Sequence, residues 1–519
     1  MRNFKVFFVV ASLLACPSLV TAQTEIRTEA QLTTSSGSHT PLWLNANKYG
    51  LSSLDKTNGY LRAGIFESLA SDSLRHWAIA YGVDVAIAKG FTSTIVLQQS
   101  YTDIRWLKGL LTIGSKQQPM ELKNQELSSG AQTLGINARP IPSIRLSLPE
   151  YWTVPYTRGW LGLKGHVAYG IQTDDRWQKD FIGDEEFKRT EHAKIHTKAG
   201  YLRIGKEGKP VSVELGLEMA CQYGGTTYTI NPYPDIPGTA EYIGIKNQDG
   251  LKGIYHAFIP GGGETGEGIY DNTSGNHLGS YLLRLNMDYE KWYLGLYADH
   301  FFEDHSQMFF LDYDGYGQGD EFNERKDNRW LIYDLKDIML GVELQLKEQS
   351  WLNTIVVEYL YTKYQSGPIN HDRTRLVSDH IAGRDGYYTN YMQTGWQHWG
   401  QVLGNPLYRS PLYNENHEIT VADSRFWAWH IGLSGSPLPR LHYRLLATWQ
   451  RGWGTYNAPL PDPQRNRSFL AEAEYAFCPK SALRGWAAKI AVGHDHGALL
   501  GNNTGIQFTI SHHFNIQKQ

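Results

Sequence analysis

Residues 363–426 bring together aromatic rings, guanidinium groups, carboxylates and imidazoles in one long polar stretch. The side chains singled out there are Arg384, Asp385, Tyr388, Trp396, His398 and Trp399. An aromatic ring can stack on the apolar face of a sugar, while neighbouring charged groups and amides hydrogen-bond to its hydroxyls. The alternative is that these aromatics pack the loop onto itself or line a membrane interface. Packing is the commoner outcome for any single residue, and we expect some sugar contact within the set.

A second group with the same chemistry is Arg451, Trp453 and Tyr456, in a stretch that continues through Asn457 and Asp462. Arginine at this place favours an acidic polysaccharide, because guanidinium groups pair with carboxylates. The competing interpretation is a proline-rich loop that is braced by Trp453. Both interpretations stay open at the level of the sequence.

Two shorter patterns could carry other chemistry. Glu303-Asp304-His305-Ser306 offers a carboxylate, an imidazole and a hydroxyl, as a hydrolase requires. Nothing nearby supplies a nucleophile elbow or an oxyanion hole, so we expect no catalysis. His494 and His496 share one face of an extended segment, but the sequence offers no third ligand, so we expect neither a metal nor a cofactor.

Composition narrows the class of protein. The chain has 519 residues, which suffice for several soluble domains or for one large barrel. Aromatic residues make up 13% and glycines number 52, which favours extended β-structure with polar turns. The formal net charge is −3, so we expect no nucleic-acid partner.

Residues 1–22 have the features of a secretory signal peptide. Arg2 and Lys5 precede an apolar stretch, and Val20-Thr21-Ala22 forms a small-residue cleavage site before Gln23. A lipoprotein signal, with Cys16 as the lipidated residue, is the rival interpretation. After cleavage before Gln23, the mature chain keeps only Cys221 and Cys478, and we expect buried or lipid-facing thiols rather than a disulfide.

Beyond the signal peptide, the main regularity is the alternation of apolar and polar residues. From Val211 to Cys221 every second residue is apolar, whereas the residues between them include Ser212, Glu214 and Glu218. Alternating residues point to opposite faces of a strand, and this second face is too polar for a dry core. Comparable segments of about ten residues recur along the chain, the length a tilted strand needs to cross a bilayer. No stretch reaches the roughly 18 apolar residues of a membrane-spanning helix.

We therefore predict an all-β fold over residues 23–519: a transmembrane antiparallel β-barrel of about 18 strands, beginning near Ile26–Leu32. Tight turns alternate with long polar stretches, as in bacterial outer-membrane barrels. Long outward loops are predicted near residues 222–280, 301–337, 363–426 and 452–467. We expect inward side chains and loops to plug the lumen.

Several blocks of the chain resemble the capsule assembly Wzi family. They are residues 40–50 (TPLWLNANKYG), 58–64 (NGYLRAG), 275–280 (GNHLGS), 301–310 (FFEDHSQMFF), 366–371 (SGPINH), 395–400 (GWQHWG), 451–456 (RGWGTY) and 500–505 (LGNNTG). The resemblance implies an eighteen-stranded outer-membrane lectin that binds capsular polysaccharide and assists its assembly or attachment, without catalysis. It assigns no binding residues.

The expected partners are capsular or other surface polysaccharide and outer-membrane lipid, with the protein acting as a monomer. A diffusion porin or sugar-uptake channel is the alternative on the same architecture, because inward charges such as Glu214, Arg284 and Glu343 could line water as readily as fill the lumen. An outer-membrane hydrolase built on His305 and Ser306 is a more remote possibility.

Overall fold

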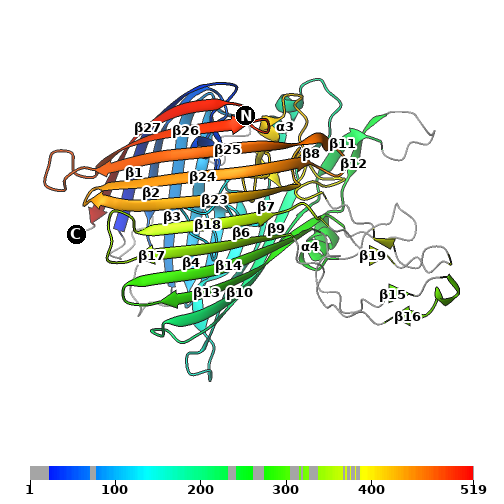
Figure 1. Ribbon diagram of the computed structural model, residues 1–519, viewed down its shortest axis with the longest axis horizontal. Coiled ribbons are helices and arrows are strands. Elements are labelled where there is room, and N and C mark those ends of the chain that lie inside the picture. The colour runs from blue at the N-terminus through cyan, green and yellow to red at the C-terminus, as the bar shows by residue number, and fades with distance from the viewer. Residues whose placement is uncertain are drawn as a thin grey trace.

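The computed structural model describes residues 23–69, 77–231, 241–260, 274–303, 315–316, 319–326, 337–365, 369–370, 375, 380–381 and 386–517. Eighteen long strands form one antiparallel sheet that curls into a cylinder (Figure 1). The barrel strands are β1 (Gln23–Ser36), β2 (Thr57–Glu67), β3 (Trp77–Lys89), β4 (Ile95–Trp106), β5 (Gly109–Ser115), β6 (Ser143–Thr153), β7 (Leu161–Ile171), β9 (Lys194–Ile204), β10 (Val211–Tyr223), β13 (Asn276–Asp288), β14 (Trp292–Glu303), β17 (Ile338–Leu346), β18 (Thr354–Tyr361), β23 (Phe426–Leu438), β24 (Leu441–Gly454), β25 (Pro459–Ala476), β26 (Trp486–Gly497) and β27 (Asn503–Gln517).

Each barrel strand pairs with the next barrel strand along the chain, and β1 pairs with β27 from Gln23↔Gln517 to Ser36↔Thr504. This last pairing closes the barrel and leaves no free edge. The predicted fold class and strand number are confirmed. The first strand is longer than the predicted Ile26–Leu32 because its pairing with β27 extends it at both ends.

The strands expose their apolar side chains outward. On β3, Ile79 and Ile87 are 64% and 63% exposed, whereas the alternate residues Asp84 and Ala86 are buried inside the barrel. A soluble sheet would bury the isoleucines, so this inverted arrangement suits a wall that faces lipid. In the part of the chain that the structure describes, no helix is both long enough and apolar enough to span a membrane.

The two ends of the barrel differ. One end carries short connections such as 107–108, 289–291 and 439–440, together with the ends of β1 and β27, and we call it the short-turn end. The other is the long-loop end, where long connections follow β10, β14 and β18 as predicted. The connection after β18 was predicted to point outward, but its residues 386–425 fold into the lumen and pack against the wall. The long loop predicted at 452–467 is wrong. Residues 459–467 belong to β25, whose pairing with β24 runs on to Gly454↔Pro459.

Smaller elements gather at the long-loop end (Figure 1). They are the helices α3 (Asp175–Ile182) and α4 (Gly250–Phe258), the turn η2 (Gly319–Glu321), the sheet of β8 (Arg189–Glu191), β11 (Thr226–Ile230) and β12 (Tyr242–Lys246), and the pairs β15 (Gly315–Tyr316) with β16 (Arg325–Lys326) and β19 (Ile369–Asn370) with β20 (His380–Ile381).

Three connections enter the lumen and fill much of it. We call residues 37–56, 116–142 and 386–425 together the plug; it includes α2 (Leu42–Asn45), β21 (Gln397–His398), β22 (Gln401–Val402) and η3 (Pro411–Tyr413). Its buried residues Trp43, Leu127 and Trp396 belong to one hydrophobic cluster with inward-facing residues of the wall. Gly432 of β23 permits close approach, since a Cβ there would lie 2.6 Å from the Leu127 carbonyl oxygen. The predicted plugged lumen is confirmed.

Candidate functional site

Four of the residues predicted for residues 363–426 lie among the described residues, and three of these are buried in the plug. Tyr388, Trp396 and His398 are 0%, 1% and 1% exposed. The Tyr388 amide donates to Glu303 at 3.0 Å, the Trp396 indole donates to the Thr133 carbonyl at 2.9 Å, and His398 Nδ1 lies 2.9 Å from the Arg139 carbonyl.

These contacts give the three side chains a packing role, which is the alternative interpretation that the sequence left open. Burial raises the pKa of Tyr388 and lowers the pKa of His398, so both side chains are held neutral. Arg384 and Asp385 lie outside the described residues. Sugar contact by any of the set remains a prediction.

Trp399 is the member of the set that reaches the surface of the plug. Its backbone has a φ of 55°, a left-handed conformation that non-glycine residues seldom adopt, and Gly400 follows with a φ of 78°. The Arg139 guanidinium lies 4.4 Å from the centroid of the indole, and the indole nitrogen donates to the Thr173 hydroxyl at 3.3 Å. An aromatic ring thus lies beside a guanidinium group that is itself buried and donates to Thr92 and Ser93, a combination that suits contact with an acidic sugar.

The second predicted group lies on the barrel wall at the long-loop end. Arg451 and Trp453 occupy alternate positions of β24 whose side chains point out of the barrel, and the Lys363 ammonium lies 4.2 Å from the Trp453 ring. Tyr456, just beyond β24, has the Arg425 guanidinium 3.8 Å from its ring centroid and donates to the Tyr364 carbonyl at 2.9 Å. The structure therefore places the two predicted groups on different surfaces.

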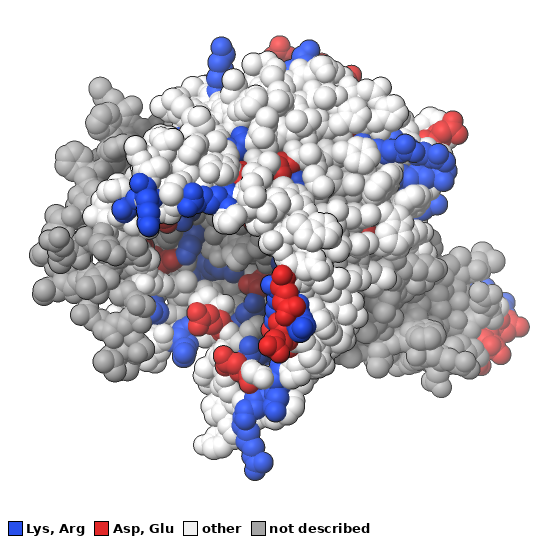
Figure 2. Space-filling view, turned by 60° about the vertical axis from the view of Figure 1, so that its left-hand side comes forward, with Lys and Arg blue, Asp and Glu red and all other residues white. Residues whose placement is uncertain are grey.

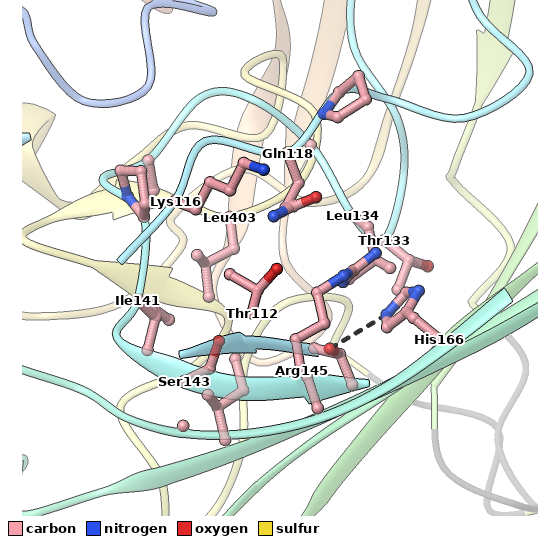
Figure 3. Close-up of a pocket in the computed structure, with 18 of the residues that line it drawn as sticks. Thr112, Lys116, Gln118, Thr133, Leu134, Ile141, Ser143, Arg145, His166 and Leu403 are labelled. Atoms are coloured by element: carbon pink, nitrogen blue, oxygen red, sulfur yellow. Dashed lines mark hydrogen bonds between the residues drawn. The ribbon is translucent and has the colours of Figure 1, made fainter. Parts of the chain in front are cut away.

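Sequence reasoning missed a cavity of about 150 Å³ between the plug and the wall formed by β5, β6, β7 and β9. Figure 3 shows Arg145, His166 and Thr133 converging on this space. His166 Nε2 lies 3.3 Å from the Thr197 hydroxyl, and Lys116 pairs with Asp103 at 2.5 Å. The Arg145 guanidinium has no ion pair or hydrogen bond with any other described residue. The signal that could have found the cavity is the inward row Ser143, Arg145 and Ser147, which is polar throughout.

Two further hollows, of about 350 and 420 Å³, open toward the short-turn end. Tyr49 and Pro119 line both the larger hollow and the cavity beside Arg145, so the two spaces adjoin. Figure 2 shows this end as a recess surrounded by charged side chains of both signs. The filled part of the lumen therefore lies between this recess and the long-loop end.

The structure gives little support to the hydrolase and the metal site that the sequence raised as alternatives. Glu303 accepts a hydrogen bond from the Tyr388 amide, and Asp304, His305 and Ser306 lie outside the described residues. The rings of His494 and His496 are 6.5 Å apart on the outer wall. Among the residues with described positions, no three potential ligands come together as a metal site.

Comparison with known proteins supports the fold. No family model matches the sequence, and no curated protein matches it either. The structure is similar to the solved structure of Wzi from Escherichia coli, described as an outer-membrane protein involved in group 1 capsule assembly and as a carbohydrate-binding β-barrel. The TM-score is 0.53 at 12% identity, and the match covers 99% of this chain and 87% of that one.

Two other solved structures match with lower scores. OprD from Pseudomonas aeruginosa and OccAB4 from Acinetobacter baumannii both give a TM-score of 0.44 at 9% identity, and each match covers 96% of this chain. The likeness to Wzi supports the fold class, a closed antiparallel β-barrel. Membership of the capsule assembly family stays a prediction.

Proposed function

We propose that this protein is an outer-membrane lectin that binds capsular or other exopolysaccharide at the cell surface and assists its assembly or attachment. The observation that carries the proposal is the packed plug. A diffusion channel needs a continuous aqueous path, whereas here buried apolar side chains of the plug meet those of the wall over much of the circumference. The described carbohydrate binding of the Escherichia coli neighbour points to the same class of ligand.

The plug is also fixed to the wall by buried polar contacts. Lys123 pairs with Asp299 at 2.7 Å, and both side chains are 1% exposed. Glu358 of β18 accepts from the Ser128 hydroxyl at 2.6 Å and from the Ser129 amide at 2.8 Å. Displacing the plug would break this buried ion pair and these hydrogen bonds, so a static seal is favoured over a mobile gate.

We assign the sugar contact first to the surroundings of Trp399 and Arg139, and second to Arg451, Trp453 and Tyr456. Each place combines an aromatic ring with a guanidinium group at the long-loop end. Tyr388, Trp396 and His398 support the first place from below by fixing the plug. Carboxylated polysaccharides are the preferred ligands because both places carry arginine.

The location follows from the same physical argument. The exposed apolar wall requires lipid around the barrel, residues 1–22 would direct export, and the long-loop end would face the outside of the cell. We expect the protein to act as a monomer, because closure of the barrel is completed within one chain.

Binding to polysaccharide isolated from the producing cells tests the proposal. The detergent-solubilised protein should retain the polymer, and Trp399→Ala should weaken retention about tenfold. Trp351→Ala is the matched control, because this indole is 62% exposed at the opposite end of the barrel. Equal retention by all three proteins would contradict the assignment to Trp399, and no retention by the wild type would contradict the lectin itself.

A solute channel is the second candidate, and the hollows that adjoin beside Tyr49 and Pro119 favour it. A narrow water path along β5–β9 would make the protein a porin despite the plug. Single-channel recordings in a planar bilayer separate the candidates. Steady large openings of the wild type would replace the lectin with the channel, whereas the sealed lectin gives none.

A further inference from the structure

On the outer wall of β24, β25 and β26, the outward side chains change from apolar to cationic or titratable toward the long-loop end. Outward positions of β25 run Tyr475, Ala473, Ala471 and Phe469 and then become Arg467 and Arg465. On β26 the outward residues Ile490 and Val492 give way to His494 and His496. With Arg451 of β24, these cationic and titratable residues form what we call the rim patch: Arg451, Arg465, Arg467, His494 and His496.

The rim patch opposes like charges across neighbouring strands. Arg451 lies directly opposite Arg465, and Arg467 lies opposite His496. Like charges in register destabilise a sheet, so their presence calls for a compensating anion. Among the described residues none of the three arginines has a carboxylate within ion-pair distance, and Nε of Arg451 is buried without a hydrogen-bond partner. Asp462, the acidic residue of β25 nearest to Arg465, forms no ion pair with them either.

The height of the rim patch matches the outer boundary of a bilayer. Arg451 follows Leu441 by ten residues of β24, which at about 3.3 Å per residue and a tilt of about 40° is a rise of about 25 Å. The apolar band of an outer-membrane barrel is also about 25 Å tall. Trp427 lies opposite Arg451 and Trp449 opposite Arg467, as expected of an aromatic girdle at this level.

We propose that the rim patch binds the phosphate groups of a glycolipid in the surrounding outer leaflet. Arginine forks bind phosphate in bidentate fashion, and three of them on adjacent strands could hold a phosphorylated disaccharide headgroup against Trp449 and Trp427. The patch faces sideways into the headgroup layer, which favours a lipid over a soluble polymer. The inference rests on the proposed outer-membrane location and does not depend on the polysaccharide site at Trp399.

Native mass spectrometry of the detergent-solubilised protein with diphosphorylated lipid A tests this inference. The wild type should carry bound lipid A, and the double variant Arg465→Gln/Arg467→Gln should bind it at least tenfold more weakly. Arg451 is left unchanged because it also belongs to the second proposed sugar site. The matched control is Lys480→Gln/Arg484→Gln, which removes two exposed cations from the connection between β25 and β26 at the short-turn end and should bind like the wild type. A difference in gel migration between the unheated and the heated samples verifies that all three proteins are folded.

Dephosphorylated lipid A is the second ligand to be tested, and it should bind the wild type no better than it binds the double variant. Equal binding of the two lipids, or equal loss in the double variant and its control, would overturn the inference. So would a double variant that keeps lipid A but loses polysaccharide, because the patch would then serve the soluble polymer. Loss of lipid A with polysaccharide retention unchanged supports the rim patch and leaves the lectin proposal intact.

Discussion

The two sides of the lumen are built differently. Along β13–β26 the wall meets the plug through apolar side chains, among them Leu278, Phe301 and Phe426, all fully buried. Along β5–β9 the wall presents Thr112, Arg145 and other polar residues to a cavity. Hydrophobic packing thus seals the barrel along β13–β26, and a path for water or for a sugar chain through the lumen would follow the polar wall of β5–β9.

The largest effect is expected on the packed side, at Tyr408. Its ring is fully buried and stacks on Tyr388 with centroids 4.0 Å apart. Tyr408→Ala should lower the free energy of unfolding by about 3–5 kcal/mol, because the plug cannot collapse into the space left behind. Urea titration in lipid vesicles measures the change.

Tyr408→Phe is the control, since the Tyr408 hydroxyl is buried without a hydrogen-bond partner. Its removal should be neutral or slightly stabilising. A loss comparable to that of the alanine variant would show that the hydroxyl, rather than apolar packing, holds this side together.

The next effect concerns the buried Lys123–Asp299 pair. Lys123→Met leaves Asp299 uncompensated, apart from the Gln132 amide at 3.3 Å, and should cost about 3 kcal/mol. Adding Asp299→Asn should restore most of the loss, because no buried charge then remains. If the double variant is as unstable as the single one, the pair acts through shape and not through charge.

A smaller effect is expected from pH, at Asp423 in the plug. Burial raises its pKa from 3.8 to about 7 although the Gly454 amide donates to it at 2.7 Å. The folded state then binds the proton more tightly than the unfolded state, so this contribution is present below pH 4 and is lost as the pH rises to about 7. Asp423→Asn should remove most of this pH dependence of the free energy of unfolding in that window. Unfolding curves of both proteins at several pH values check this, and parallel curves would contradict it.

The smallest effect is expected on the cavity side. The Arg145 guanidinium has no hydrogen bond or ion pair with a described residue, so Arg145→Gln should change the free energy of unfolding by less than about 0.5 kcal/mol. The same urea titration measures it. A loss as large as that of Lys123→Met would abolish the distinction between the two sides.

The strands were predictable because each follows a local rule. Alternation from Val211 to Cys221 gave β10 correctly, and the polar second face correctly implied an inside-out wall. The loop at 452–467 was predicted wrongly because Pro459, Pro461 and Pro463 are typical of loops, yet β25 runs through them.

The plug and the cavity were harder to predict from the sequence. Residues 116–142 have no periodicity, and they are buried by contacts with distant strands, such as Glu358 with Ser128. Trp396 and Trp399 are only three residues apart, but the first is fixed inside by the Thr133 carbonyl and the second reaches the surface. Local sequence cannot distinguish the two tryptophans, because their burial depends on which distant residues the loop packs against.

The pairing of β1 with β27 has a consequence for biogenesis. The two strands are separated by almost the whole chain, so the first strand keeps an unsatisfied hydrogen-bonding edge until the last one has been delivered. Such an edge attracts other chains, and long-range closure is slow. The seam between the termini is therefore where the nascent protein most needs a chaperone or an insertion machine.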